Sequence, residues 1–123
     1  MVDRLSSSVE VDSLPLLPIS GIMIIMAIRS YKDRGTRDIA AALDSKAARH
    51  KLPRELHRNA LLKIAALDLA KSPADLGDAT GLRLEKLSGD RIGQWSIRIN
   101  AQYRICFVWD NGDVDDVEII DYH

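Results

Sequence analysis

The sequence is poor in cysteine, with Cys106 as its only thiol in 123 residues. A single thiol cannot form an intramolecular disulfide, and a zinc site would need the three histidines together with carboxylates. No histidine neighbours Cys106 in the sequence, which favours a small buried or half-buried strand residue over a catalytic thiol. We therefore expect no metal, no cofactor and a reducing, cytoplasmic setting.

The chain also lacks an uninterrupted apolar run of the length that a membrane span requires, which is about 20 residues. Pro15 and Pro18 break up the most apolar region, and its start lacks the basic residues of a secretory signal. We interpret residues 1–25 as an N-terminal extension or a start-site artefact, with Met26 as an alternative initiator. A single domain is then expected over residues 26–123, with no contact to a membrane.

No charge of one sign dominates, since 17 Lys/Arg stand against 18 Asp/Glu for a formal net charge of −1. This balance argues against RNA binding by bulk charge alone. The charges are unevenly distributed: residues 29–63 hold ten Lys/Arg and four Asp/Glu, whereas residues 105–123 hold six acids and no Lys/Arg. We expect the basic half to face anions, with ordinary solvated helix faces as the open alternative.

Two segments have the residue spacing of amphipathic helices. Asp33 can cap a first helix that extends to Leu43, although Gly35 weakens it. A second helix is expected from about Pro53, which fits a first helical turn, to the Ser72-Pro73 pair that ends it. Its apolar residues recur every three or four positions: Leu56, Ala60, Ile64 and Leu67.

The C-terminal part changes to a period of two, which is typical of strands. Apolar and polar residues alternate over 94–99 and again over 103–109, and the Asn-Gly pair within 110–113 predicts a hairpin into a strand over 117–120. A short strand over 26–31 is expected to open the domain. This order predicts an α+β fold with an N-terminal strand and two helices packed on a mainly antiparallel twisted sheet.

Several residues have the chemistry that RNA cleavage requires, namely a proton acceptor, a proton donor and a cation for the phosphate. His123 ends the chain, and imidazole has a reference pKa of about 6.5. Arg104 should lie on the open face of the sheet, where Tyr122 or His123 would reach it if the last two strands pair. A surface arginine paired with Glu118 is the alternative.

A second group of polar residues lies just before the predicted sheet. Arg83, Glu85 and Lys86 precede a turn around Gly89 that ends at Arg91, and this turn should form a tight exposed loop. Lys86 and Arg91 could hold backbone phosphates, and Glu85 could accept a proton if its surroundings raised its pKa.

Five stretches together are similar to toxins of the HigB and GraT kind within the RelE superfamily. These stretches, within residues 28–123, are Ala65–Asp68, Arg83–Arg91, Gly93–Asn100, Tyr103–Phe107 and Val117–His123. The resemblance implies a compact RelE-like α+β toxin of a type II toxin–antitoxin system. It further implies a HigA-like helix-turn-helix antitoxin that binds and neutralises the toxin in a hetero-oligomer, and ribosome-dependent cleavage of mRNA during translation.

The resemblance also implies roles for individual residues. The terminal Asp-Tyr-His of the family matches Asp121, Tyr122 and His123, and its strand arginine matches Arg104. His123 would transfer protons, Tyr122 would orient or stack on the RNA, Asp121 would assist, and Arg104 would stabilise the transition state. Four further side chains are candidates for RNA or ribosome binding: Arg83, Lys86, Arg91 and Arg98.

One stretch departs from the family pattern. Where the HigB branch commonly carries His-Pro-Leu-Lys-Gly-Asp, this chain has Glu85-Lys86-Leu87-Ser88-Gly89-Asp90. Glu85 would then have to replace the base, and Lys86 would restore the positive charge that Ser88 lacks. The departure leaves open an alternative, a non-catalytic toxin that binds the ribosome and blocks translation or ribosome assembly. A third possibility is a module that mainly pairs with its antitoxin.

Overall fold

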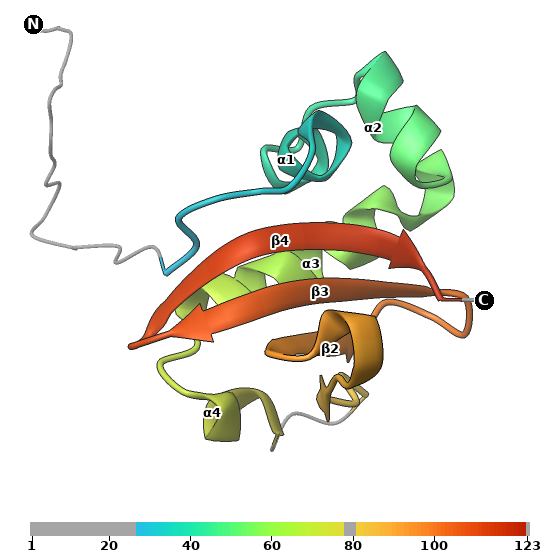
Figure 1. Cartoon of the computed structure of the whole chain (residues 1–123). Coiled ribbons are helices and arrows are strands. Elements are labelled where there is room, and N and C mark those ends of the chain that lie inside the picture. The colour runs from blue at the N-terminus through green and yellow to red at the C-terminus, as the bar shows by residue number, and fades with distance from the viewer. Residues whose placement is uncertain (1–26, 78–80, 123) are drawn as a thin grey trace, which may run out of the picture.

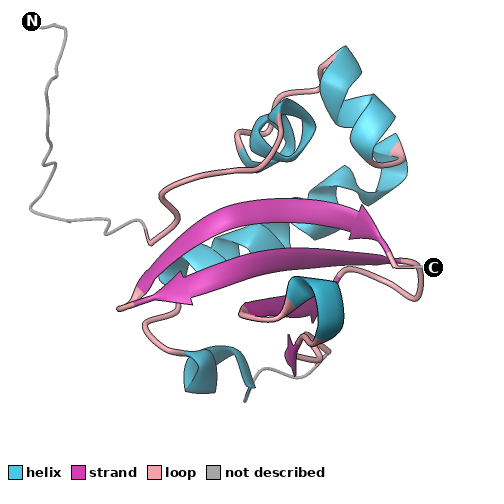
Figure 2. Cartoon of the chain, viewed as in Figure 1, coloured by secondary structure: helices cyan, strands magenta, loops and turns pink. Residues whose placement is uncertain are grey.

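The computed structural model describes residues 27–77 and 81–122, so the interpretations made for residues 1–25, Met26 and His123 lie outside the described part. The α-helices precede the run of strands along the chain, as predicted, and the 3-10 helix over Gly89–Arg91 lies between the first two strands (Figures 1 and 2). The elements, with η for a 3-10 helix, are α1 (Arg34–Ala40), α2 (Lys46–Lys51), η2 (Arg54–Leu56), α3 (His57–Leu69), α4 (Pro73–Gly77), β1 (Glu85–Lys86), η3 (Gly89–Arg91), β2 (Gln94–Arg98), β3 (Tyr103–Asp110) and β4 (Asp113–Asp121).

The four strands form one antiparallel sheet in the order β1-β2-β3-β4. The predicted hairpin between the last two strands is confirmed, because Asp110 pairs with Asp113 across a two-residue turn. Asn111 and Gly112 have φ angles of 50° and 88° in that turn. Two consecutive positive φ angles match the twist of the flanking strands, which explains the Asn-Gly sequence.

The N-terminal segment runs parallel to β4 through two isolated bridges, from Ile28 to Val114 and from Tyr31 to Val117. The prediction of a short strand over 26–31 is therefore wrong, because the described residues of this segment form two isolated bridges and no continuous strand. Between the bridges Asp116 adopts a φ of 55°, and its N–H donates to Ser30 Oγ. This turn in the β4 backbone interrupts the ladder, so the segment pairs at its two ends only.

Four α-helices are present among the described residues, whereas two were predicted. Asp33 caps α1 as expected, but the helix ends at Ala40 and does not reach Leu43. The unexpected α2 has six residues, too few to form a stable helix in isolation. Ser45 provides its N-cap, accepting the N–H of Ala48 at 3.0 Å and donating to the buried Asp38 carboxylate at 2.6 Å.

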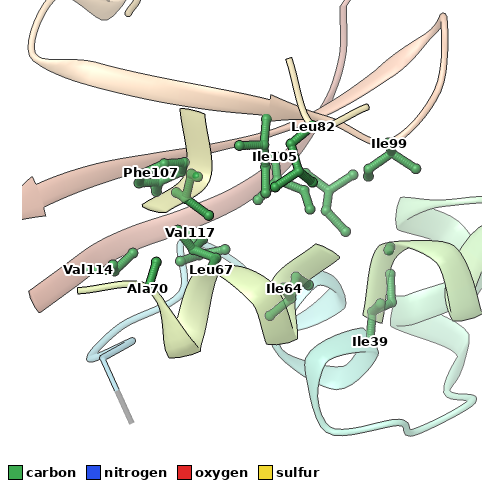
Figure 3. Close-up of a cluster of buried hydrophobic side chains, with 14 of the residues drawn as sticks. Ile39, Ile64, Leu67, Ala70, Leu82, Ile99, Ile105, Phe107, Val114 and Val117 are labelled. Atoms are coloured by element: carbon green, nitrogen blue, oxygen red, sulfur yellow. The ribbon is translucent and has the colours of Figure 1, made fainter. Parts of the chain in front are cut away.

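The second predicted helix is confirmed as η2 followed by α3. In Figure 1, α3 runs behind β3 and β4 while α1 and α2 lie beside β4. Figure 3 shows Ile64 and Leu67 of α3 packed toward Val117 and Phe107 of the sheet. No helix within the described residues is long and apolar enough to cross a membrane. The helices thus cover one face of the sheet, and the opposite face carries the residues discussed below.

Gly35 makes the contact between α1 and α2 possible. An added Cβ at this position would lie 2.7 Å from the Ala47 carbonyl oxygen and 2.7 Å from Lys51 Cβ. We predict that Gly35→Ala lowers the free energy of unfolding by about 1–2 kcal/mol, measured by urea denaturation, because overpacking outweighs the better helix propensity of alanine. Gly77→Ala is the control, since its Cβ would meet only Leu84 at 3.9 Å. Equal stability of the two variants would contradict this prediction.

Candidate active site on the sheet face opposite the α-helices

Strand register places a row of polar side chains on the face of the sheet that the helices do not cover. Glu85 pairs with Ser96, Ser96 with Cys106, and Arg98 with Arg104, and directly paired residues share a face. The intervening Ile97 and Ile105 belong to the core on the other face. Arg104 therefore points away from the helices, as predicted.

Arg104 is nevertheless buried, with 8% of its surface exposed, so the alternative of a surface arginine is wrong. Its guanidinium carbon lies 5.3 Å from the centre of the Tyr122 ring, in a cation–π contact. The segment that leads into β1 also covers it, because Arg104 Nη2 donates to the carbonyl of Arg83. The C-terminal aromatic and the chain before β1 together close over the arginine.

Ser96 provides two further contacts with Arg104. The Nε of Arg104 donates to Ser96 Oγ at 2.7 Å, and Nη2 donates to the Ser96 carbonyl at 3.3 Å. Arg104 Nη2 lies 4.0 Å from Glu85 Oε1, at the outer limit of an ion pair. The alternative partner, Glu118, lies 3.2 Å from Arg91 instead.

Glu85 and Tyr122 are joined directly, as the Tyr122 hydroxyl donates to Glu85 Oε1 at 3.0 Å. This hydrogen bond is the main reason that the pKa of Tyr122 lies above its ordinary value, and the negative charge of Glu85 adds to it. Glu85 remains about half exposed, at 52% of its side chain. A carboxylate, a phenol and a guanidinium thus form one group, which we call the Glu85–Arg104–Tyr122 cluster.

The cluster separates two adjoining hollows of about 470 Å³ and 520 Å³, and both Glu85 and Tyr122 line each of them. Volumes of this size are within the range of small-ligand sites. The first hollow is lined by Glu85, Lys86, Leu87, Ser88, Asp90, Arg91, Ile120, Asp121 and Tyr122. The second is lined by Arg83, Leu84, Glu85, Arg98, Asn100, Ala101, Arg104 and Tyr122. Three arginines border the second hollow, which makes it the more suitable of the two for a phosphate.

The cations around this hollow come from the sheet and from the segment before it, not from the basic half that we expected to face anions. Arg98 is half-buried and lies directly opposite Arg104 on the neighbouring strand. Arg83 is exposed and has a φ of 49°, an uncommon conformation for a residue other than glycine. This conformation accompanies the Arg83 carbonyl contact with Arg104.

Other predicted site residues lie outside the cluster. Lys86 lines the first hollow, and its Nζ lies 5.6 Å from the centre of the Trp95 ring, in a cation–π contact. Arg91 donates to Gln94 and Glu118, within the exposed turn that was correctly predicted. Asp121 borders the first hollow, and its carboxylate accepts from Gln102 Nε2 at 3.0 Å.

Ser96 was missed as a site residue. The alternating pattern of β2 could have indicated it, because a serine on the polar side of that strand faces the same way as Arg104. Cys106 lies on the same face and is fully buried, as the small strand residue that the sequence favoured. The described residues contain no group of three or more His, Cys, Asp or Glu side chains that could hold a metal ion.

Comparisons with known proteins agree with this fold. Residues 31–123 match the model of the HigB-like toxin family, described as a RelE-like toxin of the type II toxin–antitoxin system HigB. The chain is 43% identical over 65 residues to Toxin HigB-1 of Vibrio cholerae, a match that covers 52% of this chain and 68% of that protein. It is 38% identical over 61 residues to Endoribonuclease HigB of Proteus vulgaris, covering 50% and 65% respectively.

A solved structure, the YoeB-YefM complex from Staphylococcus aureus, is similar with a TM-score of 0.51 and 14% sequence identity. The match covers 78% of this chain and 97% of that chain. At this identity the likeness concerns the fold alone, and it confirms the predicted RelE-like α+β architecture. Since the family model spans most of the sequence, from Tyr31 through His123, the chain belongs to the HigB-like toxins, the RelE-like toxins of type II toxin–antitoxin systems.

Proposed function

We propose that this toxin is a ribosome-dependent endoribonuclease that cleaves mRNA during translation, and that its active domain comprises residues 26–123. The relative from Proteus vulgaris carries the name endoribonuclease. The observation that carries the proposal is the Glu85–Arg104–Tyr122 cluster at the ridge between two hollows. It combines a proton acceptor, a hydrogen-bond donor and a cation within reach of one phosphodiester.

The proposed reaction is attack by the RNA's own 2′-hydroxyl on the adjacent phosphorus. The 2′-oxygen loses its proton and forms a new P–O bond, while the bond from phosphorus to the 5′-oxygen breaks and that oxygen gains a proton. The products are a 2′,3′-cyclic phosphate and a 5′-hydroxyl end. Atoms and charge balance without a metal ion or any other co-reactant.

Each side chain has a defined part in this proposal. Glu85 takes the proton of the 2′-hydroxyl, and His123 gives one to the leaving 5′-oxygen. Arg104 stabilises the negative charge that develops on the phosphate oxygens. Tyr122 keeps its proton at neutral pH, as a phenol with an ordinary pKa of about 10 does, so it acts as a hydrogen-bond donor and a stacking surface. Asp121 borders the first hollow and assists from there.

The second hollow supports the substrate binding that we propose. Arg83 and Arg98 border it together with Arg104, and guanidinium groups match phosphate oxygens in geometry and charge. Lys86 and Arg91, at the first hollow, are the further candidates for contacts with RNA or the ribosome. Positioning of the message by the ribosome contributes several kcal/mol, so groups weaker than those of a free-standing ribonuclease suffice.

The family supports one class of partner for this toxin. An antitoxin is the partner class of a type II toxin, and we propose a HigA-like helix-turn-helix protein that forms a hetero-oligomer with this chain. The ribosome and its mRNA are the proposed targets, which places the protein in the cytoplasm.

One observation favours a second candidate function, a non-catalytic toxin that binds the ribosome and blocks translation or ribosome assembly. Arg104 is buried and already donates to Ser96 and to the Arg83 carbonyl, contacts that would also serve the fold alone. In that case growth arrest would leave messages intact.

We predict that the purified full-length toxin cuts mRNA on programmed ribosomes and leaves 5′-hydroxyl ends, detected by mapping RNA ends. Glu85→Gln should slow cleavage by about 100-fold, because general base catalysis is lost. Arg104→Lys should slow it by a similar factor of about 100, because lysine cannot reproduce the planar fork that stabilises the transition state.

Glu55→Gln is the matched control, since Glu55 lies exposed in η2 on the helical side of the molecule. This variant should cleave at the wild-type rate. Thermal unfolding of each variant verifies that it is folded. Translational arrest without new RNA ends in the wild type would support the ribosome-blocking alternative and contradict the nuclease.

A second prediction concerns the proton on Tyr122. In the wild type the carboxylate of Glu85 raises the pKa of Tyr122, so Glu85→Gln should let one tyrosine ionise at lower pH in a spectrophotometric titration. The folded protein favours the neutral phenol of Tyr122. The Tyr122–Glu85 hydrogen bond therefore stabilises the fold below the ordinary tyrosine pKa of about 10, and this stabilisation is lost as the pH rises through the raised pKa.

Tyr31→Phe is the control in that titration. The pKa of Tyr31 is also raised, but burial is the main cause and Asp68 the second, so Glu85 has no part in it. The shift caused by Glu85→Gln should persist in the Tyr31→Phe background and disappear in the Tyr122→Phe background. A shift that persists without Tyr122 would mean that the Glu85–Tyr122 hydrogen bond is absent in solution.

A further inference from the structure

We propose that Ser96 is a positioning residue for RNA cleavage, acting through Arg104; this inference rests on the proposed function. Ser96 lies in β2 with 0% of its surface exposed, and it touches neither hollow. Its influence on the reaction would therefore pass through the guanidinium that it contacts.

The contacts restrain one edge of the guanidinium. Arg104 Nε donates to Ser96 Oγ at 2.7 Å, while Nη2 donates to the carbonyls of Ser96 and Arg83. The ring of Tyr122 covers the group at 5.3 Å. Nη1 makes no hydrogen bond to any residue within 27–77 or 81–122. Arg104 lines the second hollow, so this nitrogen can donate to a phosphate oxygen bound there.

The same contacts keep Arg104 apart from Glu85. Nη2 stays 4.0 Å from Glu85 Oε1, longer than a direct charged hydrogen bond of about 2.8 Å. Without the Ser96 hydroxyl, Nε would lose its acceptor in a buried position, which is unfavourable. We expect the guanidinium to turn toward the Glu85 carboxylate, which lies 4.0 Å from Nη2. A direct Arg104–Glu85 ion pair would turn the guanidinium away from the phosphate and would occupy the Glu85 carboxylate, the proposed proton acceptor. Ser96 thus keeps both Arg104 and Glu85 available for the reaction.

The test is cleavage of ribosome-bound mRNA by the full-length Ser96→Ala variant under single-turnover conditions. We expect the cleavage rate at saturating toxin to fall by about 10- to 100-fold, because the cation is misplaced, with the half-saturating concentration unchanged. In an Arg104→Lys background, Ser96→Ala should cause no further loss, because the residue through which Ser96 acts has been replaced. Ser96→Thr keeps the hydroxyl and should restore most of the rate.

Ser45→Ala is the matched control for stability. Ser45 also bonds a charged group, Asp38, and caps α2, but it lies on the helical side. This variant should be destabilised and still cleave at the wild-type rate. If Ser96→Ala cleaves like the wild type, or if its loss persists in the Arg104→Lys background, Ser96 has no positioning role.

A second measurement separates this inference from the proposed function. Hydrogen exchange of the Arg104 Nε–H, followed by NMR, requires no enzymatic activity. It should be slow in the wild type and in Ser96→Thr and fast in Ser96→Ala. A wild-type protein that does not cleave RNA but shows this pattern would overturn the nuclease proposal while retaining the Ser96–Arg104 restraint. An exchange rate that Ser96→Ala leaves unchanged would overturn the inference itself.

Discussion

The burial of one positive charge, that of Arg104, is the constraint on which the candidate site depends. A charge at 8% exposure is unfavourable unless polar groups surround it, and an uncompensated one would destabilise the fold strongly. Here the compensation comes from a hydroxyl, two carbonyls, an aromatic ring and a carboxylate at 4.0 Å. These groups come from β2, from the segment before β1, from β1 itself and from the residue after β4. The contacts that compensate the charge of Arg104 therefore also bring the residues of the site together.

This arrangement explains how a site can form on the face of the sheet opposite the α-helices. The helical layer provides the hydrophobic core, with Leu67 and Phe107 fully or almost fully buried between the layers. On the other face, the described groups that lie over Arg104 are the segment before β1 and Tyr122. Such thin cover leaves two hollows beside a buried cation, so a charged RNA backbone could approach the arginine without disturbing the core.

Much of this architecture could be predicted from the sequence because local patterns determine it. The period-two segments, the Asn-Gly turn and the spacing along α3 each correspond to an element of the structure. The failures involve tertiary contacts. The six-residue α2 depends on Ser45 and the buried Asp38, and the exposure of Arg104 depends on residues that approach it from distant parts of the chain. For the site, the alternation of apolar and polar residues indicated the face on which Arg104 lies. It did not indicate that the Ser96 hydroxyl bonds Arg104, or that strand register places Lys86 against Trp95.

The central claim is that Glu85 and Tyr122 act as one unit beside Arg104. A double-mutant cycle on ribosome-dependent cleavage, with Glu85→Gln, Tyr122→Phe and the double variant, tests it most directly. If the two groups act together, the double variant loses little more rate than the more damaging single variant, with a coupling of about 1 kcal/mol or more. If the two losses simply multiply, the hydrogen bond between them has no part in the reaction, and the account of the site is contradicted.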